Sequence, residues 1–182
     1  WIGTSKGVAV YNNADRIWET DNFYASQPSL DLNDGLYHPL LETETVTAIT
    51  VDGANRKWIG TKNSGVYLIS ENGEKEILHF TQENSPLLSN NITAIVINQL
   101  NGEVFFGTDG GLISYMGDAI EGKNAYENVY VYPNPVRETY LGQVTITGLI
   151  ENTDIKITDI SGNLVYNAQS LGGQATWDGN NL

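Results

Sequence analysis

The sequence predicts an all-β fold, because one short phrase recurs along the chain and the composition favours strands. The three copies of the phrase are Trp1-Ile2-Gly3-Thr4, Trp58-Ile59-Gly60-Thr61 and Phe105-Phe106-Gly107-Thr108. They follow one another at spacings of 57 and 47 residues, and self-similarity at roughly 40–50 residues is typical of the blades of a β-propeller. The 19 glycines, the 10 tyrosines and the many Val, Ile and Thr residues favour short strands over helices.

The second copy reads as one complete blade. Alternating runs separated by Gly, Asn and Asp turns predict strands at 46–51, 57–60, 66–69 and 77–80. Four antiparallel strands joined by short turns make one propeller blade.

The first and third copies read as partial blades. The third predicts strands at 92–97, 104–107 and 112–115 without a convincing fourth. The first predicts a strand at Trp1, one at 8–11 and an outer strand at Ile17-Trp18. Rings usually need 4–8 blades, so these residues form only the C-terminal blades of a partial ring. Position 1 falls inside a repeat phrase, so we expect the true start of the chain to lie upstream.

The composition shifts near residue 117, which divides the chain into two domains. We expect propeller blades over 1–117, a polar linker over 118–128 and a small immunoglobulin-like β-sandwich over 129–182. In the last domain Pro133 and Pro135 stop a first strand. Further short strands, at the spacing of an antiparallel sandwich, are expected at 143–147, 154–160, 163–167 and 175–177.

The recurring residues have structural explanations. The aromatic residues expected to fill the space between neighbouring blades, with stacking on a ligand as the alternative, are Trp1, Trp58 and Phe105. Within strands, Gly60 and Gly107 let a neighbouring sheet approach closely. The glycines expected at tight turns with positive φ are Gly7, Gly65 and Gly111.

Charge and composition exclude several classes of function. The net charge of −13 makes binding to nucleic acid improbable. The sequence has no cysteine, which excludes disulfides, thiol chemistry and Cys-ligated zinc. It has no apolar run of 18 residues, so we expect no membrane-spanning helix within it.

We predict no catalytic, cofactor-binding or metal-binding residues. His38 and His79 lie in different segments, and no G-x-S-x-G elbow is present. The loop Asp31–Gly35 faintly resembles a calcium loop, but its glycine is one position early and an ordinary turn is favoured. An acid–base pair of Glu42 and Glu44 is explained equally well by a solvated edge.

One connection, residues 12–45, is unusually rich in aromatic side chains. Packing of this loop on the ring is favoured, and contact with a sugar or a protein partner is the alternative. The aromatic residues in and beside it are Tyr11, Trp18, Phe23, Tyr24 and Tyr37.

The repeat resembles the two-component regulator propeller repeat. The match is carried by Asn91-Ile92-Thr93-Ala94-Ile95, by Thr47-Ala48-Ile49 with Asp52, and by Trp58-Ile59-Gly60-Thr61. The stretch Asn84-Ser85-Pro86-Leu87 is similar to that family's lead-in between blades. The resemblance spans about residues 1–116 and implies extracytoplasmic rings, usually of seven blades.

The tail resembles the C-terminal sorting domain of the Bacteroidetes type IX (Por) secretion system. It is also similar to the immunoglobulin-like domain of flagellar hook-capping proteins. Three motifs occur in the expected order: Val131-Tyr132-Pro133-Asn134-Pro135, then 155–166, then Trp177-Asp178-Gly179-Asn180. A full member of the family continues with another strand after the position of Leu182, so we expect either that the given sequence omits the end of the domain or that the domain is truncated.

These observations favour a non-enzymatic binding or assembly protein of the type IX secretion system. The expected location is extracytoplasmic: at the cell surface, on the outer membrane or in the periplasm. The expected partners are secretion-machinery or cell-surface proteins, with a surface glycan or lipopolysaccharide as a further candidate. Two alternatives stay open: an oligosaccharide-binding sensor domain of a hybrid two-component regulator, and a secreted carbohydrate-active enzyme whose catalytic part lies upstream. The residues that define this architecture are Trp58, Gly60, Gly65, Gly107, Pro133, Asn134, Pro135, Gly162 and Trp177.

Overall fold

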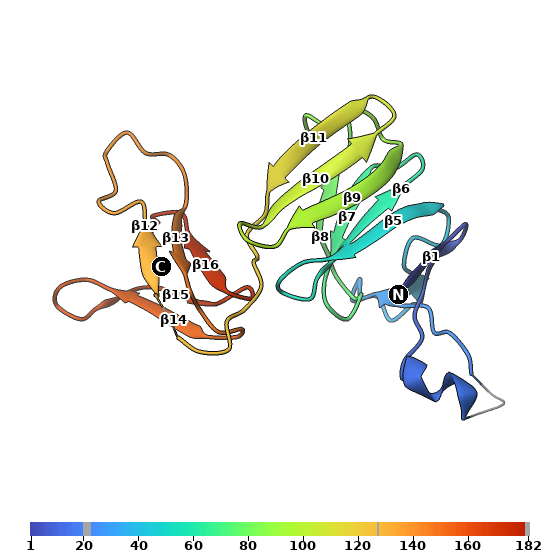
Figure 1. Ribbon diagram of the computed structural model, residues 1–182, viewed down its shortest axis with the longest axis horizontal. Coiled ribbons are helices and arrows are strands. Elements are labelled where there is room, and N and C mark those ends of the chain that lie inside the picture. The colour runs from blue at the N-terminus through green and yellow to red at the C-terminus, as the bar shows by residue number, and fades with distance from the viewer. Residues whose placement is uncertain (20–22, 127, 181–182) are drawn as a thin grey trace. The chain divides into compact units, whose positions relative to one another are not determined.

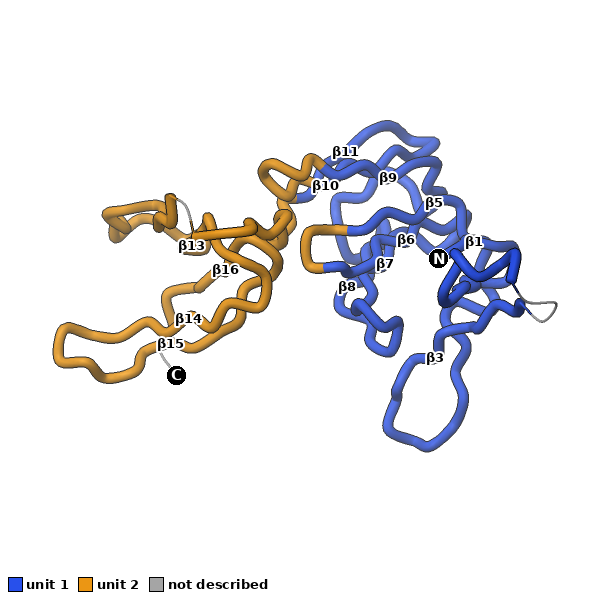
Figure 2. Tube along the Cα trace, turned by 60° about the horizontal axis from the view of Figure 1, so that its bottom comes forward, with its two compact units in different colours: residues 1–51, 55–97, 104–115 blue, residues 52–54, 98–103, 116–182 orange. Residues whose placement is uncertain are grey.

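The computed structural model describes residues 1–19, 23–126 and 128–180, and it confirms the all-β fold (Figure 1). Residues 181 and 182, where the tail was expected to stop short, lie outside the described part. No helix among the described residues is long and apolar enough to cross a bilayer. The chain divides into two compact units (Figure 2). Unit 1 comprises residues 1–51, 55–97 and 104–115, and unit 2 comprises 52–54, 98–103 and 116–182.

The copies of the repeat form separate antiparallel sheets. The greater part of these sheets lies in unit 1. The first copy gives the two-stranded sheets β1 (Ile2–Thr4) with β2 (Gly7–Ala9), and β3 (Ser29–Leu30) with β4 (His38–Pro39). The second copy gives a four-stranded sheet in the order β5 (Val46–Val51), β6 (Lys57–Thr61), β7 (Val66–Ile69) and β8 (Glu76–Phe80). The third gives a three-stranded sheet of β9 (Ile92–Asn98), β10 (Glu103–Thr108) and β11 (Gly111–Met116), with β10 central.

The outer strand predicted at Ile17-Trp18 is wrong, because residues 14–18 form a short 3-10 helix, η1 (Ala14–Trp18). Asn13 has a φ of 55°, and the backbone N–H of Arg16 donates to its carbonyl at 2.9 Å. Asn and Asp residues before Ile17 favour such a local turn over strand pairing. As a result the side chain of Trp18 is 92% exposed.

The central strands β6 and β7 of the sheet β5–β8 are buried on both faces, as those of a blade between two neighbours must be. Successive side chains of a strand point to opposite faces. One face packs Trp58, Val66 and Leu68 into a cluster with residues of the third copy, namely Ile92, Ile95, Val104 and Phe106. The other face packs Ile59, Tyr67 and Ile69 with residues of the first copy, which include Val8 and Leu40. Every residue of β6 and β7 is consequently buried.

Aromatic rings fill the space between the second and third sheets, although one differs from the expected residue. Trp58 is 1% exposed, and its ring lies 5.4 Å from the ring of Phe106. Phe105, which matches Trp58 in the repeat, is half-buried and lies outside this cluster. Trp1 packs at the edge of the other cluster, and the ammonium of Lys57 lies 5.0 Å from the centre of its ring.

Two glycines have the roles that the sequence suggested. A Cβ on Gly60 would lie 2.5 Å from Cγ2 of Ile92, so its bare backbone lets β6 approach the third sheet. Gly65 has a φ of 77°, and a Cβ there would lie 2.0 Å from the carbonyl oxygen of Phe80.

Unit 2 contains the strands expected in the tail. They form a sheet in the order β12 (Tyr130–Tyr132), β13 (Val144–Thr147) and β16 (Gln174–Trp177), and a hairpin of β14 (Asp154–Thr158) and β15 (Leu164–Gln169). β12 ends where Pro133 begins, because proline donates no ladder hydrogen bond. The small core of the tail strands consists of Leu149, Ile155 and Ala175.

Part of the expected linker is packed within unit 2. Ala119 and Ile120 are buried, and the backbone N–H of Gly173 donates to the carbonyl of Ile120 at 2.8 Å. The domain boundaries at residues 117 and 128 stay a prediction.

Replacing Trp58 by alanine should lower the free energy of unfolding by about 3–5 kcal/mol, because a cavity opens between two sheets. Trp18→Ala is the matched control and should change it by no more than about 0.5 kcal/mol, since that side chain is exposed. Urea unfolding followed by circular dichroism measures both changes. Equal effects of the two substitutions would contradict the packing role of Trp58.

Candidate functional site

The surface beside η1 is apolar, concave and rich in aromatic rings. Its cavity measures about 660 Å³ and is lined by Trp1, Ile2, Tyr11, Ala14, Ile17 and Phe23. The rings of Tyr11 and Phe23 stack with centres 5.1 Å apart and planes at 14°. We call these six residues, together with the exposed Trp18 of η1, the aromatic surface.

The structure brings together only some of the aromatic residues that the sequence placed in this connection. Tyr11 and Phe23 meet in the stacked pair, and Trp18 follows the cavity-lining Ile17. Tyr37 lines a different cavity, and its hydroxyl donates to the carbonyl of Gln27 at 2.9 Å. Tyr24 is 79% exposed and does not line the cavity. The sequence signal therefore indicated the segment, whereas the residues that make up the surface depend on the fold.

A second cavity, of about 400 Å³, is acidic. It is lined by Tyr37, His38, Pro39, Leu41, Glu42, Thr43, Glu44, Tyr67 and Glu76. Burial first, and then the negative charges of Glu44 and Glu76, raise the pKa of Tyr67 to about 12. His79 stacks on the Tyr67 ring at 3.9 Å, and its Nε2 donates to the carbonyl of Ser64 at 2.7 Å. Glu42 and Glu44, considered above as an acid–base pair, both line this cavity.

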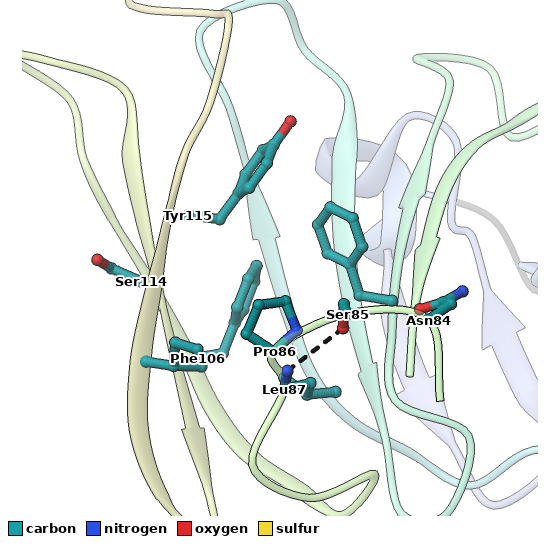
Figure 3. Close-up of a pocket in the computed structure, with 9 residues that line it drawn as sticks. Asn84, Ser85, Pro86, Leu87, Phe106, Ser114 and Tyr115 are labelled. Atoms are coloured by element: carbon teal, nitrogen blue, oxygen red, sulfur yellow. Dashed lines mark hydrogen bonds between the residues drawn. The ribbon is translucent and has the colours of Figure 1, made fainter. Parts of the chain in front are cut away.

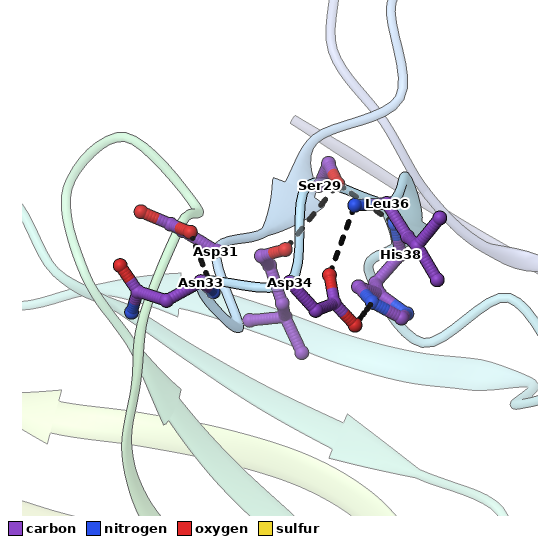
Figure 4. A network of polar contacts seen from close by, with 7 residues as sticks. Ser29, Asp31, Asn33, Asp34, Leu36 and His38 are labelled. Carbon is purple, nitrogen blue, oxygen red and sulfur yellow. Dashed lines mark hydrogen bonds and ion pairs between the residues drawn. The ribbon is translucent and has the colours of Figure 1, made fainter.

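The loop that faintly resembled a calcium site is closed by its own hydrogen bonds (Figure 4). Oδ1 of Asp31 accepts the backbone N–H of Asn33, and Oδ1 of Asp34 accepts that of Leu36, both at 2.9 Å. Oδ2 of Asp34 lies 2.8 Å from Nε2 of His38. The backbone N–H of Leu36 first, and then His38, hold the pKa of Asp34 below its ordinary value. The carboxylates of Asp31 and Asp34 thus form hydrogen bonds that stabilise the turn.

The described residues contain no group of three or more His, Asp or Glu side chains arranged to hold a metal ion. His38 and His79 have the different partners given above, Asp34 and Ser64. The predicted absence of catalytic, cofactor-binding and metal-binding residues stays a prediction.

A third cavity, of about 280 Å³, lies between β8 and β11 and is largely apolar (Figure 3). Its apolar lining residues are Phe80, Pro86, Leu87, Phe106, Ile113 and Tyr115, and Asn84, Ser85 and Ser114 complete it. The rings of Phe80 and Tyr115 lie 5.0 Å apart. The sequence marked Asn84–Leu87 only as a connection between blades, and no sequence signal pointed to a cavity there.

Glu44→Gln should lower the pKa of Tyr67 from about 12 while leaving it above the ordinary 10, because burial is the larger cause. Since the folded pKa is the higher one, the stabilisation from neutral Tyr67 is complete below pH 10. It is lost as the pH rises through about 12. NMR titration of ¹³C-labelled tyrosine measures the pKa, with Glu83→Gln as a control outside the cavity. Titration of Tyr67 near pH 10 in the unsubstituted protein would contradict this assignment.

Comparison with known proteins supports the resemblance of the tail to a sorting domain. Residues 130–182 match the family described as the secretion system C-terminal sorting domain. No curated protein sequence matches the chain.

Solved structures that are similar to the chain include the following two. One is PorZ, an essential bacterial surface component of the type IX secretion system of Porphyromonas gingivalis, at 37% identity and a TM-score of 0.68 over 100% of this chain and 25% of PorZ. The other is the extracellular domain of a hybrid two-component system from B. thetaiotaomicron, at 20% identity and a TM-score of 0.47 over 98% of this chain and 26% of that one. The chain thus spans about a quarter of the length of each.

The match at residues 130–182 and the similarity to PorZ bear on where the protein acts. They associate the chain with type IX secretion and give it an extracytoplasmic, cell-surface location. Residues 130–182 are therefore similar to the secretion system C-terminal sorting domain.

Proposed function

We propose that the chain is the C-terminal part of a PorZ-like protein that binds and assembles with other surface components of the type IX secretion system. The observation that carries this proposal is the 37% identity to PorZ over the full length of the chain, tail included. In this proposal the protein is not an enzyme, and its repeats are a scaffold for partner proteins.

The packing of unit 1 supports a scaffold role. A sheet whose central strands are buried on both faces, as β6 and β7 are, holds its connecting turns in fixed positions. Binding residues are commonly carried on loops that such a rigid scaffold positions. The aromatic surface lies mostly on the connection between β2 and β3, and the acidic cavity lies beside the connection between β4 and β5.

The exposed first strand of the tail supports docking with the secretion machinery. β12 lies at the edge of its sheet, and Tyr130, Val131 and Tyr132 are 57%, 41% and 45% exposed. The rings of the two tyrosines lie 5.7 Å apart. An exposed edge strand with aromatic side chains is suited to contact with a partner protein.

Deletion of residues 129–182 from the full polypeptide should reduce its exposure on the cell surface while the propeller stays folded. Surface labelling of intact cells measures exposure, and limited proteolysis of the purified protein measures folding. Ile160→Ser, a change of a fully exposed side chain in the same domain, is the control and should leave exposure unchanged. Unchanged surface labelling after the deletion would count against the proposal.

A second candidate function, oligosaccharide binding, is favoured by the aromatic surface. A large apolar patch on a soluble protein commonly marks an interaction site, and a Trp side chain offers one apolar face for stacking. Trp18 is 92% exposed and follows directly on Ile17, which lines the 660 Å³ cavity. A surface glycan or lipopolysaccharide fits this chemistry.

Under this second function, Trp18→Ala should weaken binding to the polysaccharide of lipopolysaccharide about tenfold, equivalent to about 1.4 kcal/mol. Isothermal titration calorimetry measures the dissociation constant. Leu100→Ala removes a comparably exposed side chain that is not part of the aromatic surface and should leave the affinity unchanged. Equal affinities of the Trp18 variant and the unsubstituted protein would exclude stacking on this side chain.

A further inference from the structure

Asparagine is followed directly by glycine at two places in the chain. Asn72-Gly73 lies in the turn between β7 and β8, and Asn101-Gly102 lies in the turn between β9 and β10. Both glycines have a positive φ, of 86° and 77° respectively. Their backbone N–H groups donate within the turn, to the carbonyl of Ser70 at 3.0 Å and to that of Asn98 at 2.8 Å. The two pairs thus have similar backbones, and differences between them arise from the asparagine side chains.

An Asn-Gly pair can react with itself without an enzyme. The backbone nitrogen of the glycine attacks Cγ of the asparagine, a new N–Cγ bond closes a five-membered succinimide, the Cγ–Nδ2 bond breaks, and ammonia leaves with the proton of the backbone amide. One water molecule then adds to either carbonyl of the ring and gives aspartate or isoaspartate. Glycine favours the attack because it has no side chain to hinder the nitrogen and its backbone moves freely. The reaction requires that the asparagine side chain leave its hydrogen bonds and turn toward the next peptide.

The side chain of Asn72 is held on both of its polar atoms. Its Oδ1 accepts the hydroxyl of Ser70 at 2.8 Å and the backbone N–H of Glu74 at 3.2 Å. Its Nδ2 donates to Oε2 of Glu74 at 2.5 Å. A Cβ on Gly73 would lie 2.8 Å from Cη2 of Trp1, so this turn is also closely packed. Three hydrogen bonds must break before Cγ of Asn72 can reach the nitrogen of Gly73.

The side chain of Asn101 is held much less. Its Oδ1 accepts the backbone N–H of Glu103 at 3.0 Å, and within the described residues this is the one hydrogen bond of that side chain. Asn101 is exposed, and the preceding Leu100 is 91% exposed. One hydrogen bond must therefore break before Cγ of Asn101 can turn toward the nitrogen of Gly102, and water has access to the product.

We propose that Asn101 is a site of spontaneous deamidation, in which Gly102 supplies the attacking nitrogen, and that the turn around Asn72 protects the second Asn-Gly pair from the same reaction. The modification needs only water as a co-reactant.

The two products change the turn between β9 and β10 in different ways. Aspartate adds one negative charge beside Glu103, in a chain whose net charge is already −13. Isoaspartate passes the main chain through Cβ and so lengthens it by one atom. The carbonyl of Gly102 accepts the backbone N–H of Gly117 at 3.1 Å, and a Cβ on Gly102 would lie 2.7 Å from the carbonyl oxygen of Ala119. An extra atom in the main chain displaces these contacts.

Timed incubation of the full-length polypeptide under native conditions tests this proposal. Peptide mass spectrometry measures the replacement of the side-chain NH₂ by OH at each position. The product at Asn101 should form at least about tenfold faster than the product at Asn72, because two fewer hydrogen bonds have to break. Unstructured peptides that span each pair are the reference and should react at similar rates. The proposal is overturned by a rate at Asn72 that equals or exceeds the rate at Asn101, by the same difference between the two peptides, or by an unreacted Asn101 when its peptide reacts.

The nature of the product tests the route of the reaction. A succinimide gives isoaspartate and aspartate together, whereas direct hydrolysis of the side-chain amide gives aspartate alone. Electron-transfer dissociation distinguishes the two isomers, and aspartate as the sole product at position 101 would exclude attack by the nitrogen of Gly102.

A substitution on the protected turn tests the role of its hydrogen bonds. Glu74→Ala removes the acceptor of Nδ2 of Asn72 and should speed the reaction at Asn72 several-fold while leaving the rate at Asn101 unchanged. An unchanged rate at Asn72 in this variant would contradict the protection that we assign to that turn.

Discussion

The architecture depends on the burial of both faces of β6 and β7, the central strands of the sheet β5–β8. Trp58, Val66 and Leu68 face one neighbour, while Ile59, Tyr67 and Ile69 face the other. Neither set can leave water unless a sheet of similar shape stands on each side, so a single repeat has no stable core of its own. This requirement explains why the phrase recurs in the sequence and why the turns between strands are short.

Much of the fold could be predicted from sequence because period-2 patterns and turn residues are local signals. They located β5 to β11 and the strands of the tail. The wrong strand prediction at Ile17-Trp18 also comes from relying on local signals. Two apolar residues do not distinguish a strand from a 3-10 turn. The sequence predicted Phe105 between the sheets, but Phe106 lies there. Which of the two is buried depends on which face of β10 meets the second sheet, and this is a tertiary property.

The candidate sites were less accessible to sequence reasoning, because cavities form between segments that lie far apart in the chain. The composition of residues 12–45 indicated an aromatic surface, but the pairing of Tyr11 with Phe23 depends on the path of that connection. The apolar cavity joins β8, the segment 84–87 and β11, none of which carries a motif for binding. The tail was recognised most readily, since each of its motifs is an unbroken run of residues. Together they match a family model directly.

Gly60 has an effect that reaches beyond its own strand. Its backbone lies so near Ile92 that even a methyl group would have to displace that side chain. Any larger residue would therefore tilt the second and third sheets apart at that point. In a circular array such a tilt is inherited by every following member, so a small local error becomes a gap where the circle should close. The missing side chain thus lets the second and third sheets pack closely at this point.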